Sequence, residues 1–167
     1  MGRLVEEVKE WNTPLVGAYL LWNFTKSYVH AQAQNEAPVV ILHFIAHPLL
    51  TSHEYSDTIN NYRPNLASYV RGFTDKHKTD LLACFNERVY KQRKITMEAI
   101  DIAVASGLLV WDTDKATLWP LKDFKQARGN AHRGIDIKTK SKKAEILGRW
   151  FANLDINTIT SYLGVIL

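Results

Sequence analysis

The segment after Gly107 limits the possible folds more than any other part of this chain. Two apolar runs, residues 108–111 and 116–121, flank the tetrapeptide Asp112-Thr113-Asp114-Lys115. Short polar residues of this kind favour tight turns, so the pattern predicts a β-hairpin. Three stretches with the apolar spacing of helices precede it, and three helices followed by a hairpin make a winged-helix arrangement.

The three helices before the hairpin are predicted from their first residues. Pro64 begins a helix that reaches about Phe73. Thr79 and Thr96 are N-cap residues for the next two, because a threonine hydroxyl can accept from a free backbone N–H group. Gly107 ends the third, since glycine readily takes the left-handed conformation that closes many helices.

The first third of the chain is also expected to be helical. Thr13-Pro14, a polar cap followed by proline, begins a helix over residues 15–33. Its buried face is expected to hold Leu15, Tyr19, Trp22 and Tyr28. Residues 37–50 are almost all apolar, and periodicity alone does not separate a buried helix from a buried strand there. The helical surroundings favour a helix that is broken near Pro48.

The length of 167 residues is that of one domain. We expect a mainly α fold with a small β-hairpin, that is, a helical domain containing a winged-helix-like unit. Its parts are an N-terminal helical part (1–62), the winged-helix-like part (64–121), a basic linker (122–139) and a C-terminal helical pair (140–167). In that pair, Ser141 begins one helix, and Asp155 or Asn157 caps the other.

No set of residues indicates catalysis or metal binding. The sequence has no Gly-x-Ser-x-Gly, phosphate-loop or dinucleotide-turn pattern. His43 and His47 share a helix face, but zinc needs three or four well-placed ligands, so we interpret them as hydrogen-bonded core residues. The single cysteine, Cys84, lies in an apolar run and is expected to be a buried thiol. We therefore expect no enzyme activity, no cofactor, no metal and no small-molecule substrate.

The sequence also predicts a cytoplasmic protein without a membrane segment. Residues 1–12 are charged and do not resemble a signal segment. The longest apolar stretch, residues 37–50, is too short to span a bilayer. A single cysteine excludes an internal disulfide framework and is typical of a reducing compartment.

The positive charge of the chain is concentrated in one segment. The net charge is +4, whereas residues 122–143 carry eight Lys or Arg against two Asp, a local +6, which leaves −2 for the remainder. This segment is either a solvated linker or an arm for nucleic acid or an acidic partner. Candidate nucleic-acid contacts are Lys91, Arg93, Lys94, Lys125, Arg128, Arg133, Lys138 and Lys140.

A DNA-binding winged helix would read bases with its third helix, here residues 96–106. That helix carries Glu98 and Asp101 and no Lys or Arg, which suits phosphate-lined DNA poorly. A protein-docking role is therefore favoured, and a stand-alone DNA-binding regulator is the alternative. The candidate partner-interface residues are aromatic or apolar, on the predicted wing and near residue 167: Trp111, Trp119, Tyr162, Leu163 and Leu167.

The order of several short segments resembles a known family. The segments are Asn12-Thr13-Pro14, Gly17-Ala18-Tyr19-Leu20-Leu21-Trp22, Tyr28, residues 40–50 ending in His47-Pro48-Leu49-Leu50, Phe85-Asn86-Glu87-Arg88, Ile95-Thr96-Met97-Glu98-Ala99-Ile100, Ala105-Ser106-Gly107-Leu108-Leu109, Leu147-Gly148-Arg149-Trp150-Phe151-Ala152, Ile159 and Tyr162-Leu163-Gly164-Val165. Over nearly the whole chain, this order resembles the middle component of prokaryotic ABC-ATPase three-component systems, with Lamassu-type defence subunits as the closest functional relatives.

The resemblance implies an adaptor role. Such subunits look like small helical proteins between an SMC/Rad50-like coiled-coil ATPase and an effector, with a nuclease expected as the effector. The complex would act against phage or plasmid DNA, and duplex DNA would be contacted through the complex. No catalytic residue is carried over from the family, which agrees with the absence of a catalytic pattern in this sequence.

Overall fold

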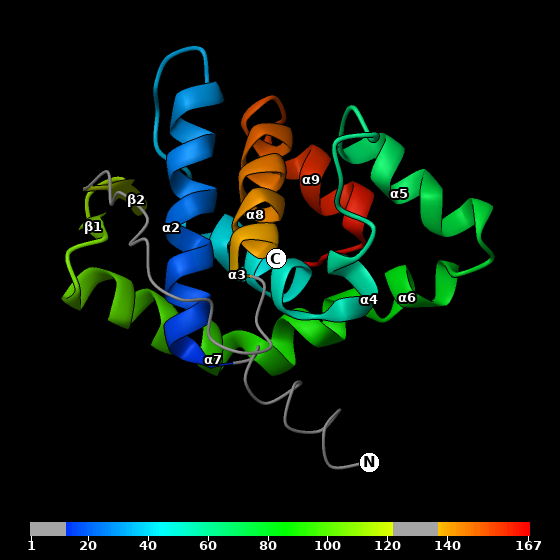
Figure 1. Ribbon diagram of the computed structural model, residues 1–167, viewed down its shortest axis with the longest axis horizontal. Helices are drawn as coiled ribbons and strands as arrows, with labels where there is room; N and C mark the ends of the chain where they lie inside the picture. Colours follow the sequence, from blue (N-terminus) through cyan, green and yellow to red (C-terminus); the bar gives the residue numbers. More distant parts are fainter. Residues whose placement is uncertain (1–12, 122–136) are drawn as a thin grey trace.

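The computed structural model describes residues 13–121 and 137–167, in which helices surround a buried core and one short hairpin lies at one end (Figure 1). The helices are α2 (Pro14–Ala31), α3 (Val40–Thr51), α4 (His53–Ser56), α5 (Leu66–Asp75), α6 (Thr79–Ala83), α7 (Phe85–Ala105), α8 (Ile137–Ala152) and α9 (Ile156–Leu163), and the strands are β1 (Leu109–Asp112) and β2 (Thr117–Pro120). The prediction of a mainly α fold with a small β-hairpin is confirmed.

Helix α2 stands between the hairpin and α8, packs along α8 and crosses α7 (Figure 1). It begins as predicted, with Pro14 in the first turn and the Thr13 hydroxyl accepting from the Val16 N–H at 3.4 Å. Gly148 lets α8 approach closely, because a Cβ there would lie 2.5 Å from the Phe24 carbonyl oxygen of α2. The prediction that Leu15 is buried is wrong: it lies in the first turn, before the buried residues of α2 begin, and is 67% exposed.

Residues 40–51 form a helix, α3, rather than a strand. Pro48 lies inside this helix, and the break that was predicted near Pro48 falls slightly later, at Ser52 between α3 and α4. The proline lies near the C-terminal end of the helix, which ends three residues later at Thr51. The Thr51 hydroxyl then donates to the His47 carbonyl at 2.8 Å, and the Ser52 N–H donates to the Pro48 carbonyl at 3.2 Å.

Helix α7 is one unbroken helix of 21 residues, where two helices were predicted. Thr96 is not an N-cap but a buried residue in its middle, and its hydroxyl donates to the Gln92 carbonyl at 3.0 Å. The segment has no glycine or proline that would interrupt a helix. The predicted break lies earlier, at Cys84 between α6 and α7, where the thiol is exposed rather than buried.

Three helices (α5, α6 and α7) precede the hairpin in the order of a winged-helix unit, and that assignment stays a prediction. The hairpin itself is confirmed: β1 and β2 pair antiparallel, with Trp111 opposite Leu118. Gly107 ends α7 as predicted, with a φ of +68°. Leu109 and Leu118 face the core, and β2 also forms a bridge with Val39 before α3.

The C-terminal pair begins earlier than predicted. Helix α8 is already present at Ile137, so Ser141 does not begin it but lies buried within it. The last residues of the predicted linker, 137–139, are therefore helical, and the rest of it lies outside the described residues. Asp155 caps α9 as predicted, with its carboxylate accepting from the Thr158 N–H at 2.9 Å.

A candidate partner-binding groove

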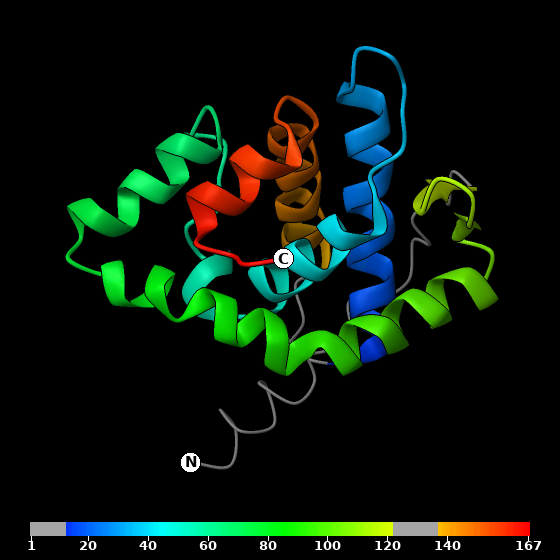
Figure 2. The ribbon, with the colours of Figure 1, turned by 180° about the vertical axis from the view of Figure 1, so that it is seen from behind.

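An open apolar groove with a volume of about 530 Å³ lies between α3, α7 and the residues after α9. Figure 2 shows these three segments side by side, with the chain after α9 crossing towards α3 above α7. Residues three and four apart on each helix share one face, so each helix supplies one wall. The lining residues are Ile41, Phe44 and Ile45 of α3, Asn86, Glu87, Val89, Tyr90 and Arg93 of α7, and Val165, Ile166 and Leu167.

Residues 165–167 form the third wall of the groove, and the way α9 ends sets their position. Gly164 takes a left-handed conformation, with a φ of +65°, and the Val165 N–H donates to the Thr160 carbonyl at 2.9 Å. Val165 is 8% exposed and anchors the segment in the core. The Ile166 N–H then donates to the Asn86 side-chain oxygen of α7 at 3.0 Å, which holds the segment beside the groove.

Three of the large side chains that line this groove are open to solvent. Ile166 is 82% exposed and Leu167 is 65% exposed, and Tyr90 on the facing helix is 63% exposed. Continuous apolar surface with a polar rim is typical of interaction sites on soluble proteins. The groove is therefore a candidate protein-binding surface.

Within the part of the chain that the structure describes, the groove has a paired charge at one end and unpaired positive charges at the other. Glu87 is paired with Lys91 at 2.7 Å, and the hydrogen bond and charge of Lys91 lower the Glu87 pKa. The Arg93 guanidinium lies over the Tyr90 ring, 4.3 Å from its centre, and Lys94 is exposed beside it. Among residues 13–121 and 137–167, neither Arg93 nor Lys94 has a carboxylate within ion-pair distance.

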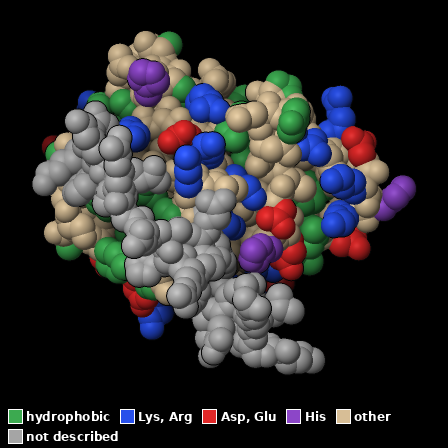
Figure 3. All heavy atoms as spheres, viewed as in Figure 1, with side chains coloured by type: hydrophobic (Ala, Val, Ile, Leu, Met, Phe, Trp, Pro, Cys, Tyr) green, Lys and Arg blue, Asp and Glu red, His purple; other side chains and the backbone are tan. Residues whose placement is uncertain are grey.

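The predicted nucleic-acid contacts differ in where they lie: some are exposed, one is buried and some lie outside the described residues. Lys91, Arg93 and Lys94 are exposed on α7, and Lys138 is exposed on α8. Lys125, Arg128 and Arg133 lie outside the described residues. At the end formed by α5 and α6, positive and negative side chains are interspersed, so that surface is not of a single sign (Figure 3).

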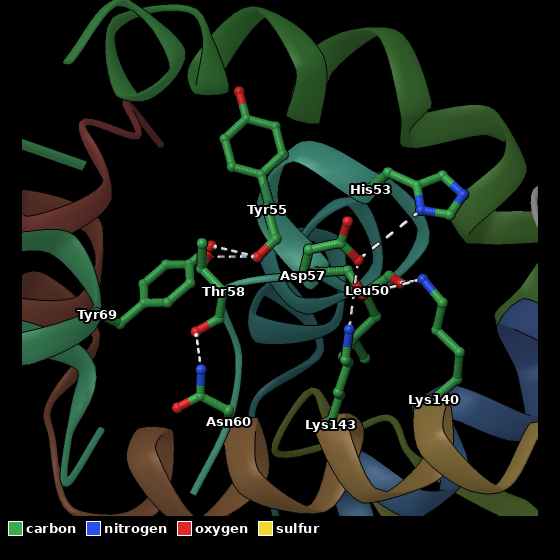
Figure 4. Close-up of polar contacts among 10 residues, drawn as sticks. Leu50, His53, Tyr55, Asp57, Thr58, Asn60, Tyr69, Lys140 and Lys143 are labelled. Atoms are coloured by element: carbon green, nitrogen blue, oxygen red, sulfur yellow. Dashed lines mark hydrogen bonds and ion pairs between the residues drawn. The ribbon is translucent and has the colours of Figure 1, made fainter. Parts of the chain in front are cut away.

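Lys140, one of the predicted nucleic-acid contacts, is buried and so offers no surface to nucleic acid, a correction of the prediction. Its side chain extends from α8 towards Leu50 (Figure 4). Its Nζ donates to the Leu50 carbonyl at 3.2 Å and to the Ser56 hydroxyl at 2.9 Å. Burial, and secondarily the charge of Lys143, lower the Lys140 pKa to about 8. Lys143 itself is paired with Asp57 at 3.4 Å. Lys140 thus connects α8 to the C-terminal end of α3 and to α4.

The predicted partner-interface residues do not form one surface. Trp111 and Trp119 are half-buried on the hairpin, and Tyr162 is 40% exposed on α9. Leu163 is fully buried in the core and offers no surface to a partner, a correction of the prediction. Of the five, only Leu167 lines the groove.

Sequence reasoning missed most of the groove. Its walls include Phe44, Val89 and Tyr90, none of which was predicted to belong to a site. The available signal was apolar residues on a second face of each helix, beyond the stripe needed for burial. That signal alone does not show that α3 and α7 lie next to each other.

His43 and His47 are confirmed as hydrogen-bonded core residues. Nε2 of His43 lies 2.8 Å from the Thr25 hydroxyl, and Nδ1 of His47 lies 3.0 Å from the Thr96 hydroxyl. Burial lowers the pKa of each imidazole to about 4. Within the described part of the chain, no group of three or more His, Cys, Asp or Glu is placed to hold a metal ion. Nor does any helix there have the length and hydropathy needed to cross a membrane.

One protein family matches the sequence along its entire length. The family is described as ABC-three component (ABC-3C) system Middle Component 3, and the match covers residues 1–167. No curated protein and no solved structure matches the chain.

Proposed function

Because the chain belongs to the Middle Component 3 family of ABC-three component systems, we propose that it is a non-catalytic adaptor between an SMC/Rad50-like ATPase and an effector protein. A middle component is one part of a system of three, so it has protein partners. We propose a nuclease as the effector and defence against phage or plasmid DNA in the cytoplasm as the role of the complex, in the manner of Lamassu-type systems.

The groove between α3, α7 and residues 165–167 is the observation that carries this proposal. An adaptor must present apolar surface that only a partner covers, and exposed Ile166 and Leu167 provide such a surface. The hairpin supplies a second contact in this proposal. Val110 is 41% exposed there, and its cross-strand neighbour Trp119 is half-buried.

The titratable groups also support a non-catalytic role. Among the described residues, three basic side chains have pKa values well below their ordinary range. They are His43, His47 and Lys140. All three are buried and hydrogen-bonded to neighbouring helices, and none of them lines the groove. Their pKa values follow from burial in a core rather than from placement in a catalytic cleft.

The adaptor role is favoured over a stand-alone DNA-binding regulator. The second half of α7, which would enter the major groove, exposes Glu98 and Asp101. Carboxylates repel the phosphate backbone, which supplies much of the affinity of DNA-binding proteins. The exposed cations Lys91, Arg93 and Lys94 lie on the first part of the same helix, beside the apolar groove.

Co-purification tests the proposal. The chain is expressed with the proteins encoded beside it, and the mass of what elutes with it is measured by light scattering and mass spectrometry. We expect a complex that contains a long coiled-coil ATPase. A lone 19.1 kDa protein, or a homodimer, would show that the adaptor role is wrong.

A variant then links the groove to assembly. Ile166→Asp places a charge in the groove and should remove the partner from the complex, whereas the free energy of unfolding should change little because the side chain is 82% exposed. Tyr62→Asp is the matched control, because Tyr62 is 96% exposed and does not line the groove. Equal loss of the complex in both variants would show that the groove has no specific role in assembly.

A further inference from the structure

The dimensions of the groove define what kind of partner segment it can hold. The lining residues of α7 run from Asn86 to Arg93, which is about 10 Å along the helix axis. Its two long walls are the faces of α3 and α7, which present side chains in helical rows. Such rows accept the side-chain ridges of another helix. About two turns of helix, with apolar side chains at positions i, i+3 or i+4, and i+7, would fill the groove.

The charged side chains at the two ends of the groove indicate which kind of helix would bind there. At one end of the groove, Glu87 is already neutralised by Lys91. At the other end, Arg93 and its neighbour Lys94 face solvent without a carboxylate partner in the described part of the chain. A partner that buries the apolar walls therefore also covers an uncompensated positive end. Charge complementarity at that end would set the register and orientation of the bound segment.

We infer that the groove binds an acidic amphipathic helix of a partner subunit, with its apolar stripe on Phe44, Val89 and Ile166 and a carboxylate near Arg93. This inference rests on the proposed adaptor function and adds the chemistry of the partner segment. Arg93 is suited to the contact because a guanidinium can bind a carboxylate through two parallel hydrogen bonds while it stays stacked on Tyr90.

Site-specific crosslinking in the assembled complex tests the inference directly. The photoreactive residue p-benzoylphenylalanine replaces Phe44, and the crosslinked peptide is identified by mass spectrometry. We expect a peptide from another subunit that combines an apolar helical stripe with Asp or Glu within two turns. A crosslink to a second copy of this chain, to DNA, or to a segment without carboxylates would overturn the inference, as would the absence of any crosslink. The same residue at position 62 is the control for crosslinking at an exposed site outside the groove.

Charge reversal tests the electrostatic part. Arg93→Glu combined with Lys94→Glu should weaken the binding of the partner subunit about tenfold or more at low salt, and should reduce the dependence of binding on ionic strength. Lys76→Glu combined with Lys78→Glu makes the same change of charge beside α6 and should leave binding as in the wild type. These positions are exposed in the structure, so folding is expected to be retained in both pairs.

The two proposals fail in different ways. If the wild-type chain does not assemble with an ATPase or effector, the adaptor function is wrong. If the wild type assembles and the Arg93 and Lys94 variant binds as tightly as the wild type, the acidic-helix inference is wrong and the adaptor function stands.

Discussion

A methyl group in place of the Gly17 hydrogen would lie 2.6 Å from Nε2 of His47, so α2 and α3 meet closely at this one glycine. The same Cβ would lie 3.0 Å from the Cβ of Ala99, which belongs to α7. Three helices thus meet at one point, and the ring of His47 is fixed there by the Thr96 hydroxyl on its other side.

Gly17→Ala should destabilise the protein by about 1–3 kcal/mol, although alanine is the better helix former by about 1 kcal/mol. The added methyl group overlaps the buried imidazole of His47, which is hydrogen-bonded to Thr96 and is not free to turn away. Urea unfolding measures the change. An unchanged or higher free energy of unfolding would show that the three helices have room to separate.

Gly164→Ala should cost about 1–2 kcal/mol of stability because Gly164 has a left-handed backbone, not because space is lacking. The nearest atom to an added Cβ is the Leu82 carbonyl oxygen at 3.7 Å. Gly107→Ala is the matched control, since its φ is nearly the same and no atom lies within 4 Å. Both variants should lose similar stability in thermal melts, but only Gly164→Ala should weaken binding at the groove. Equal effects on binding would contradict this.

The buried histidines should make the fold sensitive to acid. Their pKa values are about 4 in the folded state and near 6.5 when unfolded, so the unfolded chain binds more protons between these values. Stability should therefore fall as the pH drops from 6.5 to 4, by on the order of 3 kcal/mol for each histidine. His43→Gln should flatten this dependence, measured by urea unfolding at several pH values. His30→Gln, at an exposed position, should retain it.

Lys140 should act at the opposite end of the pH scale. Its pKa is about 8 in the folded state and 10.5 as an ordinary lysine, so in that window the unfolded chain again binds more protons. Stability should rise as the pH increases from 8 to 10.5. Lys140→Met should remove this rise, as seen in the difference between the two proteins at each pH. An identical rise in the variant would assign it to other groups.

The elements with strong local signals were predictable from the sequence. Pro14, Gly107 and Asp155 act through their own backbone or capping chemistry, which does not depend on distant residues, and the structure places all three as expected. The hairpin is similar, because its turn tetrapeptide lies between two short apolar runs.

The remaining features depend on contacts that are distant in sequence. A threonine hydroxyl can cap the start of a helix, or it can lie within a helix and donate to the carbonyl four residues before it. Thr96 does the latter, and its hydroxyl also contacts His47 of the neighbouring helix α3. Lys140 looked like a surface cation because its partners, Leu50 and Ser56, are more than 80 positions away. The groove joins residues 41–45, 86–93 and 165–167, and no local pattern reports that they meet.

The continuity of α7 has a consequence for how two partners could be held. Its 21 residues span about 30 Å, with the groove on the first part and the hairpin directly after the last. A helix without a break at Thr96 has no hinge between these two surfaces. The distance between the groove and the hairpin is then fixed by the length of α7. Partners bound at both surfaces would therefore keep a constant separation and would move together with the chain.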